Sequence, residues 1–275
     1  MHRLEVGDDD YPPWLRTIPD RPPVVYVRGR LPRGLRCVAC VGTRVPSSFG
    51  CAAARGVAGF LAARGWSVVS GLALGVDTIA HEAALAASGH TVAVLANGLD
   101  RVHPRQNEPL AARILAAGGA LLSEQPPGTA ALPRHLVARN RIQSGMSTAT
   151  AVMQTDLVGG TMHTARYTLL QGRLLVAAVP AGSHAGEPKS RGLLALTQRT
   201  GTDLVRLLEA RGSLAELLLR EFADRPVAQQ LRGRGDYDTL VAELEVAINS
   251  ARRPQSEASS VLAATPPAIQ LRLAF

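Results

Sequence analysis

The sequence predicts an α/β fold: a doubly wound, mostly parallel sheet with helices on both faces. Two observations predict it. Short apolar runs typical of strands alternate six times with longer runs typical of helices, and several of the turns between them carry glycine. Helical connections of this kind are the crossovers that parallel strands need, and right-handed crossovers place helices on both faces of the sheet.

Composition excludes several other classes of protein. The chain has 275 residues, of which 46% are hydrophobic, which is enough for one large domain with a buried core and a small appendage. No apolar run approaches the roughly 18 to 20 residues of a bilayer span, and the acidic first ten residues do not resemble a signal peptide. Three cysteines form no disulfide framework. We therefore expect a cytoplasmic protein with no membrane association.

The net charge points to a polyanionic partner without establishing one. The formal charge is +8, and clustered cations attract phosphates and release their counterions. Of the 30 basic residues only Lys189 is a lysine, so part of the arginine content reflects the same compositional pressure that makes the chain rich in alanine.

The first half of the chain predicts an N-terminal segment followed by four strands. The segment, residues 1–35, packs on the sheet and contains an edge strand at residues 24–27, among prolines. The following strands are expected at residues 37–41, 67–70, 91–95 and 120–123. Helices are expected where a capping residue opens a longer run that ends near glycine, at residues 47–64, 77–87 and 107–117.

The second half predicts the remaining elements of a domain that spans residues 36–212. Strands are expected at residues 150–154 and 174–179, and helices at residues 139–146, 161–170, 193–197 and 202–210. Residues 213–275 are expected to form a helical and flexible C-terminal tail. It would hold two amphipathic helices, at residues 214–222 and 239–250, before a segment rich in Ser, Pro and Ala.

Glycine turns follow three of the predicted strands. The turns are Gly42-Thr43-Arg44, Gly71 to Gly75, and Gly159-Gly160-Thr161. In an open parallel sheet the ligand lies past the carboxyl ends of the strands, where glycine lets the backbone approach a phosphate and the next helix supplies unpaired N–H groups. One such turn is also explained by close packing of a helix on the sheet. Three of them favour an anion site, to which Arg44 adds a bidentate donor.

Two further groups of residues, and the single residue Glu124, have both a functional and a structural interpretation. Asp77 and His81 are one helical turn apart, which suits a hydrogen-bonded acid and imidazole, but Asp77 could equally cap the helix and His81 be buried. Arg139-Asn140-Arg141 opens a predicted helix, and its two guanidiniums near the positive helix end favour a shared anion over a solvated basic face. Glu124 follows a strand and could accept from a ligand hydroxyl or cap the next turn.

The sequence gives no signal for a metal or a nucleotide cofactor. Cys37 and Cys40 point to opposite faces of a strand, and no second Cys or His pair lies nearby to complete a zinc site. There is no glycine–lysine phosphate loop and no dinucleotide fingerprint, which argues against an ATPase and a nicotinamide enzyme. We expect no metal and no cofactor.

Taken as a set, these residues resemble the DNA processing protein A (DprA/Smf) family. The motifs follow the family's order over roughly residues 11 to 210. They are Tyr11-Pro12, Val41-Gly42-Thr43-Arg44, Ser70-Gly71-Leu72-Ala73 with Gly75 and Asp77, Ala80-His81, Gly98-Leu99-Asp100, Leu122-Ser123-Glu124, Arg139-Asn140-Arg141-Ile142, Gly160-Thr161-Met162, and Val179-Pro180.

The resemblance implies an extended Rossmann-like domain that forms a homodimer and binds single-stranded DNA without sequence preference. It implies a protein of competence and DNA recombination, which protects incoming strands and loads RecA recombinase on them during natural transformation. It implies binding without catalysis, so no catalytic residue is expected.

The resemblance also implies a role for particular residues. Arg44 would hold a backbone phosphate, the turns at Gly42 and Gly71 would shape the pocket, and Arg139, Asn140 and Arg141 would line the groove for the strand. The phosphate-binding set is completed by Thr43, Ser70, Gly75, Gly160 and Thr161, with Asp77, His81, Glu124 and Leu136 as possible support of the pocket. Leu136 stands where the family usually has Phe, so a base–aromatic stack worth about 1 to 3 kcal/mol is missing.

Two other functions remain open from the sequence. The first is a sensor of a nucleotide-derived ligand, which the losses around the groove favour. The second is an enzyme similar to the phosphoribohydrolases that release bases from nucleoside monophosphates. Those enzymes carry a Pro-Gly-Gly-x-Gly-Thr-x-x-Glu motif, and residues 158–164 have neither its proline nor its glutamate.

Overall fold

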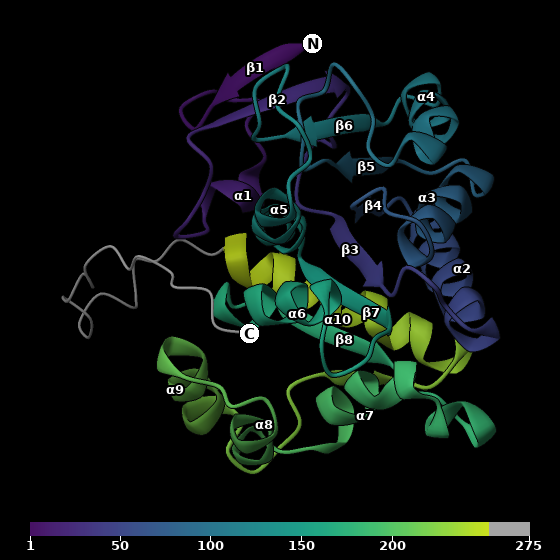
Figure 1. Cartoon of the computed structure of the whole chain (residues 1–275), viewed down its shortest axis with the longest axis vertical. Coiled ribbons are helices and arrows are strands. Elements are labelled where there is room, and N and C mark those ends of the chain that lie inside the picture. The colour runs from purple at the N-terminus through teal and green to yellow at the C-terminus, as the bar shows by residue number, and fades with distance from the viewer. Residues whose placement is uncertain (253–275) are drawn as a thin grey trace.

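The structure is a computed structural model that describes residues 1–252, and its centre is one nine-stranded sheet (Figure 1). The strands are β1 (His2–Glu5), β2 (Val24–Gly29), β3 (Cys37–Gly42), β4 (Ser67–Ser70), β5 (Thr91–Val94), β6 (Ala120–Ser123), β7 (Ala149–Gln154), β8 (Leu174–Ala178) and β9 (Gln229–Leu231). Their order is β1-β2-β6-β5-β4-β3-β7-β8-β9. The pairs β1–β2 and β2–β6 are antiparallel, and the others are parallel. The predicted fold class is confirmed.

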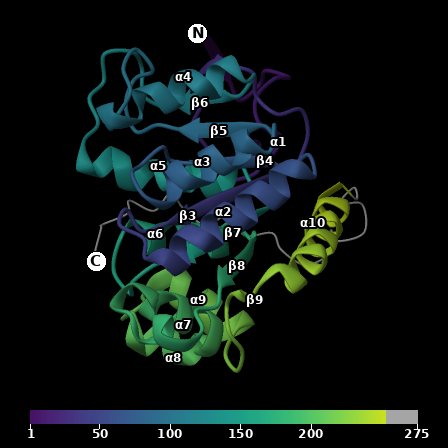
Figure 2. The ribbon, with the colours of Figure 1, turned by 90° about the vertical axis from the view of Figure 1, so that its right-hand side faces the viewer.

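Two layers of helices enclose the sheet. The layer that crosses the front of Figure 2 contains α2 (Ser48–Ala63), α3 (Val76–Ala86) and α4 (Glu108–Ala116), and α10 (Tyr237–Arg252) packs with α2. The opposite layer contains α1 (Pro13–Arg16), α5 (Pro133–Gly145), α6 (Gly160–Leu170), α7 (Arg191–Gln198), α8 (Gly201–Leu207) and α9 (Gly212–Glu221). Successive residues of β3 face opposite layers: Cys40 packs in the core beneath α2 and α3, and Val41 packs in the core beneath α6 and α7.

Two central strands send the chain to opposite faces of the sheet. β3 leads through α2 to β4 on one side, whereas its other neighbour, β7, leads through α6 to β8. Because α2 and α6 belong to different layers, the turns that follow the carboxyl ends of β3 and β7 lead in opposite directions and leave a space between them. Ligands of open α/β sheets bind at such a topological switch point.

Helix α5 begins earlier than the sequence predicts. It starts at Pro133 rather than at Arg139, because the fixed φ of proline suits the first helical position and its missing N–H costs nothing there. Arg139-Asn140-Arg141 therefore lies in the middle of α5. The expectation that this motif opens a helix, at its positive end, is wrong.

The ends of the sheet also differ from prediction. The expected edge strand is β2, but β1 pairs with its free side and becomes the edge. The sheet also continues beyond residue 212, since β9 pairs with β8. A strand of three residues and a strand of mostly polar residues carry little apolar pattern to predict from. Of the flexible tail expected after the last helix, residues 253–275 lie outside the described residues.

The cysteines occupy the positions that their spacing predicts. Cys37 packs in the layer of α5 and Cys40 in the layer of α2, and burial raises the pKa of each thiol to about 12. Within residues 1–252, no group of three or more His, Cys, Asp or Glu side chains is placed to hold a metal ion. In the same part of the chain, no helix has both the length and the apolar character that crossing a membrane requires.

Candidate functional site

A pocket of about 470 Å³ lies at the switch point between β3 and β7, and we call it the switch-point pocket. Its walls come from the turn after β3, the start of α3, one side of α5, and the segment that joins β7 to α6. The lining residues are Val41, Gly42, Thr43, Arg44, Ala73, Asp77, Pro133, Leu136, Val137, Arg139, Asn140, Gln143, Thr155, Asp156, Val158, Gly159, Gly160, Thr161, Thr164 and Lys189. Nine of the fifteen residues proposed from the sequence line it.

The turn after β3 carries Arg44 to the mouth of the pocket. The backbone N–H of Thr43 donates to the carbonyl of Gln154 at 2.8 Å, which ties the end of β3 to the end of β7. Gly75 packs against this turn with a φ of 83°, and a Cβ at Gly75 would come within 2.5 Å of the Arg44 carbonyl. The Arg44 side chain is exposed, and no carboxylate of residues 1–252 lies within 4 Å of it.

The N-terminus of α6 faces the same pocket. Its first turn contains no acidic residue, and the N–H groups of Gly160 and Thr161 find no carbonyl partner among the described residues. Such N–H groups and the helix dipole favour a bound anion. Lys189 adds a cation nearby, where its Nζ donates to the carbonyl of Val45 at 2.6 Å. Backbone donors and side-chain cations therefore converge on one opening.

One side of α5 forms the opposite wall. Pro133, Leu136, Val137 and Asn140 line the pocket at the spacing of a single helix face. The amide of Asn140 donates to the carbonyl of Gly160 at 3.1 Å, so α5 holds the start of α6 in place.

Arg139 forms the floor of the pocket. Its Nη1 donates to the carbonyl of Gly71 at 2.7 Å and also to the carbonyl of Val94. Burial lowers its pKa to about 10, although nearby Asp77 favours the charged form. A Cβ at Gly71 would meet this guanidinium at 2.5 Å, so the glycine is needed for the contact. Arg139 thus supports the loop after β4 more than it offers donors to a ligand.

Asp77 lines the pocket and holds the same loop from its other side. Its Oδ2 accepts from the backbone N–H of Gly71 at 3.1 Å and of Ala73 at 3.3 Å. Burial raises the pKa of this carboxyl, while Arg139 and the two N–H groups oppose that rise. Asp77 therefore belongs to a buried network around the loop.

Arg141 does not line the pocket, which corrects the prediction of a groove built from all three residues of its motif. Two residues along a helix correspond to a rotation of about 200°, so Arg139 and Arg141 point to opposite sides of α5. Arg141 donates to both carboxylate oxygens of Glu124, at 2.8 and 2.6 Å, and to the carbonyl of Asp20 at 2.9 Å. Glu124 is likewise away from the pocket, so neither of its two predicted roles is the one observed.

His81 and Ser70 are structural residues in this fold. The hydroxyl of Thr91 donates to the carbonyl of Val68 at 2.7 Å, so the imidazole Nδ1 of His81, 2.7 Å from that hydroxyl, must donate to it. Burial lowers the pKa of His81 to about 3. Ser70 donates to the carbonyl of Cys40 at 2.7 Å. For His81 the structure selects the buried alternative, and Asp77 and His81 do not act as a pair.

Two features of the site were not predicted from the sequence. Lys189 is the single lysine of the chain, but its position after β8 did not single it out. Three aliphatic side chains beside or in the lining are exposed to solvent: Val45 at 66%, Leu74 at 42% and Val158 at 84%. We call these three the aliphatic rim. Exposure of apolar side chains around a cationic pocket is visible only in three dimensions.

Comparison with known proteins identifies the family to which this pattern belongs. The family model of DNA recombination-mediator protein A matches residues 2–210. Protein Smf of Escherichia coli (strain K12) is 41% identical over 193 residues, which cover 70% of this chain and 50% of the relative. The DNA processing protein DprA of Bacillus subtilis is 37% identical over 194 residues, covering 68% and 64%. The chain thus spans about half the length of the curated relatives it matches.

Solved structures share the fold. DNA processing protein A of Streptococcus pneumoniae superposes with a TM-score of 0.63 at 30% identity, covering 80% of this chain and 74% of the other. DNA processing protein A of Helicobacter pylori, for which a single-stranded DNA binding mode is described, has a TM-score of 0.66 at 24% identity. That match covers 87% of this chain and 99% of the other.

Proposed function

The chain belongs to the DNA recombination-mediator protein A family, and from this premise we propose that its switch-point pocket binds the backbone of single-stranded DNA. The observation that carries the proposal is the convergence on one opening of Arg44, Lys189 and the free N–H groups of α6. Neither cation has a carboxylate within 4 Å among residues 1–252. A phosphate backbone supplies the charge that this opening lacks.

The aliphatic rim supports a single strand over a duplex as the ligand. A single strand exposes the apolar faces of its bases beside its phosphates, whereas a duplex stacks them in its interior. Val45, Leu74 and Val158 offer such faces an apolar contact next to the phosphate-binding groups. The Helicobacter pylori protein with the same fold is described as binding single-stranded DNA.

We further propose that the pocket binds without turnover. Both carboxylates that line it are engaged in the fold, since Asp77 accepts from two backbone N–H groups and Asp156 accepts from Arg191 at 2.9 and 3.0 Å. Glu124, the remaining acidic residue considered from the sequence, is paired with Arg141. A general acid or base would need a carboxyl group free to reach the substrate.

The cellular role that fits the family is that of a recombination mediator. We propose that the protein acts in the cytoplasm as a homodimer, protects incoming single strands and loads RecA recombinase on them in natural transformation. Membership of the family supports this role. A strand-exchange assay with RecA on strands already coated by a single-strand binding protein tests it, and no gain in exchange on adding this protein would contradict it.

Binding of a labelled oligothymidylate, followed by fluorescence anisotropy at several salt concentrations, tests the pocket itself. We expect binding that weakens with salt by about 0.7 log units per contacted phosphate for each log unit of salt, and weaker binding of a duplex. Arg44→Ala should reduce that slope by about 0.7. Arg33→Ala is the matched control, because Arg33 is also exposed but lies at the amino edge of the sheet, before β3.

Two results would overturn the proposal in different directions. If the oligothymidylate does not bind at low salt while a mononucleotide raises the melting temperature, the pocket belongs to a nucleotide sensor. If a nucleoside monophosphate is hydrolysed, and Asp77→Asn abolishes the turnover, the protein is an enzyme.

A further inference from the structure

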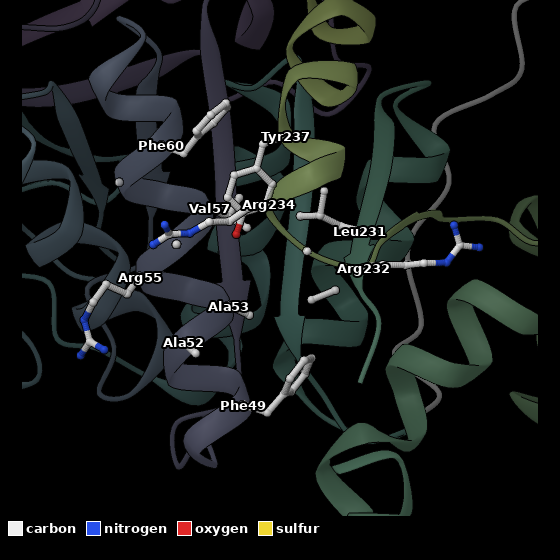
Figure 3. A pocket seen from close by; sticks show the side chains of 14 residues that line it. Phe49, Ala52, Ala53, Arg55, Val57, Phe60, Leu231, Arg232, Arg234 and Tyr237 are labelled. Atoms are coloured by element: carbon white, nitrogen blue, oxygen red, sulfur yellow. The ribbon is translucent and has the colours of Figure 1, made fainter. Parts of the chain in front are cut away.

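A second groove, of about 750 Å³, lies between α2 and the segment that links β9 to α10 (Figure 3). We call it the α2–α10 groove. One wall is α2, from Phe49 to Phe60, and the other includes Leu231, Arg232, Arg234 and Tyr237. This second wall lies beyond residue 210, where the match to the family model ends. The groove is thus completed by a part of the chain outside the match to the family model.

The register of the sheet aligns this groove with the switch-point pocket. Gly42 pairs with Gln154, Val152 with Ala177, and Ala178 with Leu231, so the ends of β3, β7, β8 and β9 are nearly level. The chain segments that leave these strands emerge along one edge of the sheet. With a strand spacing of 4.7 to 4.9 Å, the three steps from β3 to β9 amount to about 14 Å. A few nucleotides of single strand span that distance.

Cations that pair with no carboxylate of residues 1–252 lie at both ends of this path. Arg55, Arg232 and Arg234 are exposed, and none has a carboxylate within 4 Å in the part of the chain that the structure describes. In Figure 3 Arg234 extends across the groove toward α2, while Arg232 extends the other way. Arg44 and Lys189 mark the opposite end of the path.

The carboxylates near the path are engaged by the fold. Glu187 contacts His184 Nδ1 at 2.6 Å and accepts from Gln154 at 3.0 Å, and Asp156 is paired with Arg191. Asp236 accepts from the backbone N–H of Arg232 at 2.6 Å, which holds the turn that carries Arg232 and Arg234. The edge therefore offers a run of cations to a polyanion.

The groove also provides the aromatic surface that the pocket lacks. Phe49 stands at the groove end nearest the sheet edge, one residue after α2 begins, and is only partly buried. Its ring lies 5.8 Å from that of His184, on the loop after β8. Sites for single strands combine a cationic groove with aromatic side chains on which bases stack. The switch-point pocket has Leu136 and no aromatic residue in its lining.

We propose that a single strand held in the switch-point pocket continues along the carboxyl edge of the sheet into the α2–α10 groove. There Arg232 and Arg234 bind its phosphates and Phe49 contacts a base. The proposal rests on the proposed function, because the strand must first be held at Arg44. It assigns a nucleic-acid contact to Arg232 and Arg234, which lie outside the family match.

Oligothymidylates of two lengths test this extension. Because the path is about 14 Å long, a strand of about two nucleotides fills only the pocket, whereas one of about fifteen reaches the groove. For the longer strand, the double variant R232A/R234A should bind at least fivefold more weakly than the unmodified chain, and its salt slope should fall by about 1.4. The shorter strand should bind both proteins equally. Phe49→Leu should weaken only the longer strand and leave the slope unchanged.

The control is the double variant R30A/R33A, which removes the same charge from the opposite edge and should bind both strands as the unmodified chain does. If R232A/R234A binds the longer strand with unchanged affinity and slope, the extension is wrong while the pocket stands. Equal losses in the two double variants would also overturn it, since the effect would then be one of net charge. Failure of the unmodified chain to bind either strand would instead overturn the proposed function.

Discussion

The two sides of α5 show how one sequence motif can serve two purposes. Arg139 and Asn140 face the switch-point pocket, whereas Arg141, the next residue, faces the N-terminal segment and pairs with Glu124. Near the pocket side, the Arg44 guanidinium has no carboxylate partner, and the N–H groups of Gly160 and Thr161 have no carbonyl partner, among residues 1–252. On the other side the side chains of Arg141 and Glu124 are only 14% and 16% exposed, and their charges satisfy each other.

The difference teaches that a binding residue is marked by N–H donors that the fold leaves free, rather than by its charge alone. Arg141 carries the same guanidinium as Arg44, but four of its five N–H groups already donate to Glu124 and to carbonyls. Arg44 is exposed, and its side chain pairs with no carboxylate in the described part of the chain. A count of basic residues along the sequence cannot separate these two cases.

Removing Arg139 should have the largest effect, because this residue belongs to both the pocket and the core. Arg139→Ala leaves the carbonyls of Gly71 and Val94 unpaired and Asp77 buried without its nearby cation. We expect a loss of about 3 kcal/mol in the free energy of unfolding, together with loss of strand binding. Urea denaturation measures the free energy of unfolding. Arg134→Ala, an exposed change on the same helix, is the control, and equal stability of the two variants would contradict this account.

Removing Arg141 should separate the two sides of α5. Arg141→Ala breaks the paired contact with Glu124 and the contact with Asp20, so we expect a loss of about 2 kcal/mol in the free energy of unfolding. Strand affinity, measured below the unfolding transition, should not change. A clear drop in affinity with unchanged stability would show that the side of α5 we regard as structural binds the ligand.

Behind the pocket, His81 should make stability depend on pH. The pKa of His81 is about 3 in the fold and about 6.5 in the unfolded chain, so between these values only the unfolded chain binds the proton. The contribution of His81 to the free energy of unfolding is therefore full above pH 6.5 and is lost as the pH falls toward 3. Within this range, His81 lowers the free energy of unfolding by about 1.4 kcal/mol for each pH unit of acidification. Comparing the pH slope of the unfolding free energy between pH 6.5 and 5 tests this. His81→Asn should have the shallower slope, and an identical slope would mean that His81 does not stay neutral in the fold.

The aliphatic rim should give the smallest effect and the one most specific to a single strand. Val158→Ser removes part of an apolar contact worth roughly 0.7 kcal/mol, so we expect about threefold weaker binding of oligothymidylate and unchanged binding of duplex. Val246→Ser is the matched control, since Val246 is 63% exposed on α10. Equal effects of the two changes would remove the rim from the proposed interface.

The sequence predicted the sheet and the glycine turns well because both follow from local patterns. The apolar runs at β4 and β6 have the predicted bounds, and Gly42 and Gly75 stand where a Cβ would collide. Where Arg141 points depends on where α5 starts, and that start was set by Pro133 rather than by the motif. The position of Lys189 depends on how the loop after β8 folds back to Val45, which no local pattern encodes.

The most direct test of the central claim is a crystal structure of the protein with a short oligothymidylate. We predict a phosphate within hydrogen-bond distance of the Arg44 guanidinium and of the N–H groups of Gly160 or Thr161, at the carboxyl edge between β3 and β7. A strand bound instead over Arg141 and Glu124, or at the amino edge of the sheet, would contradict it.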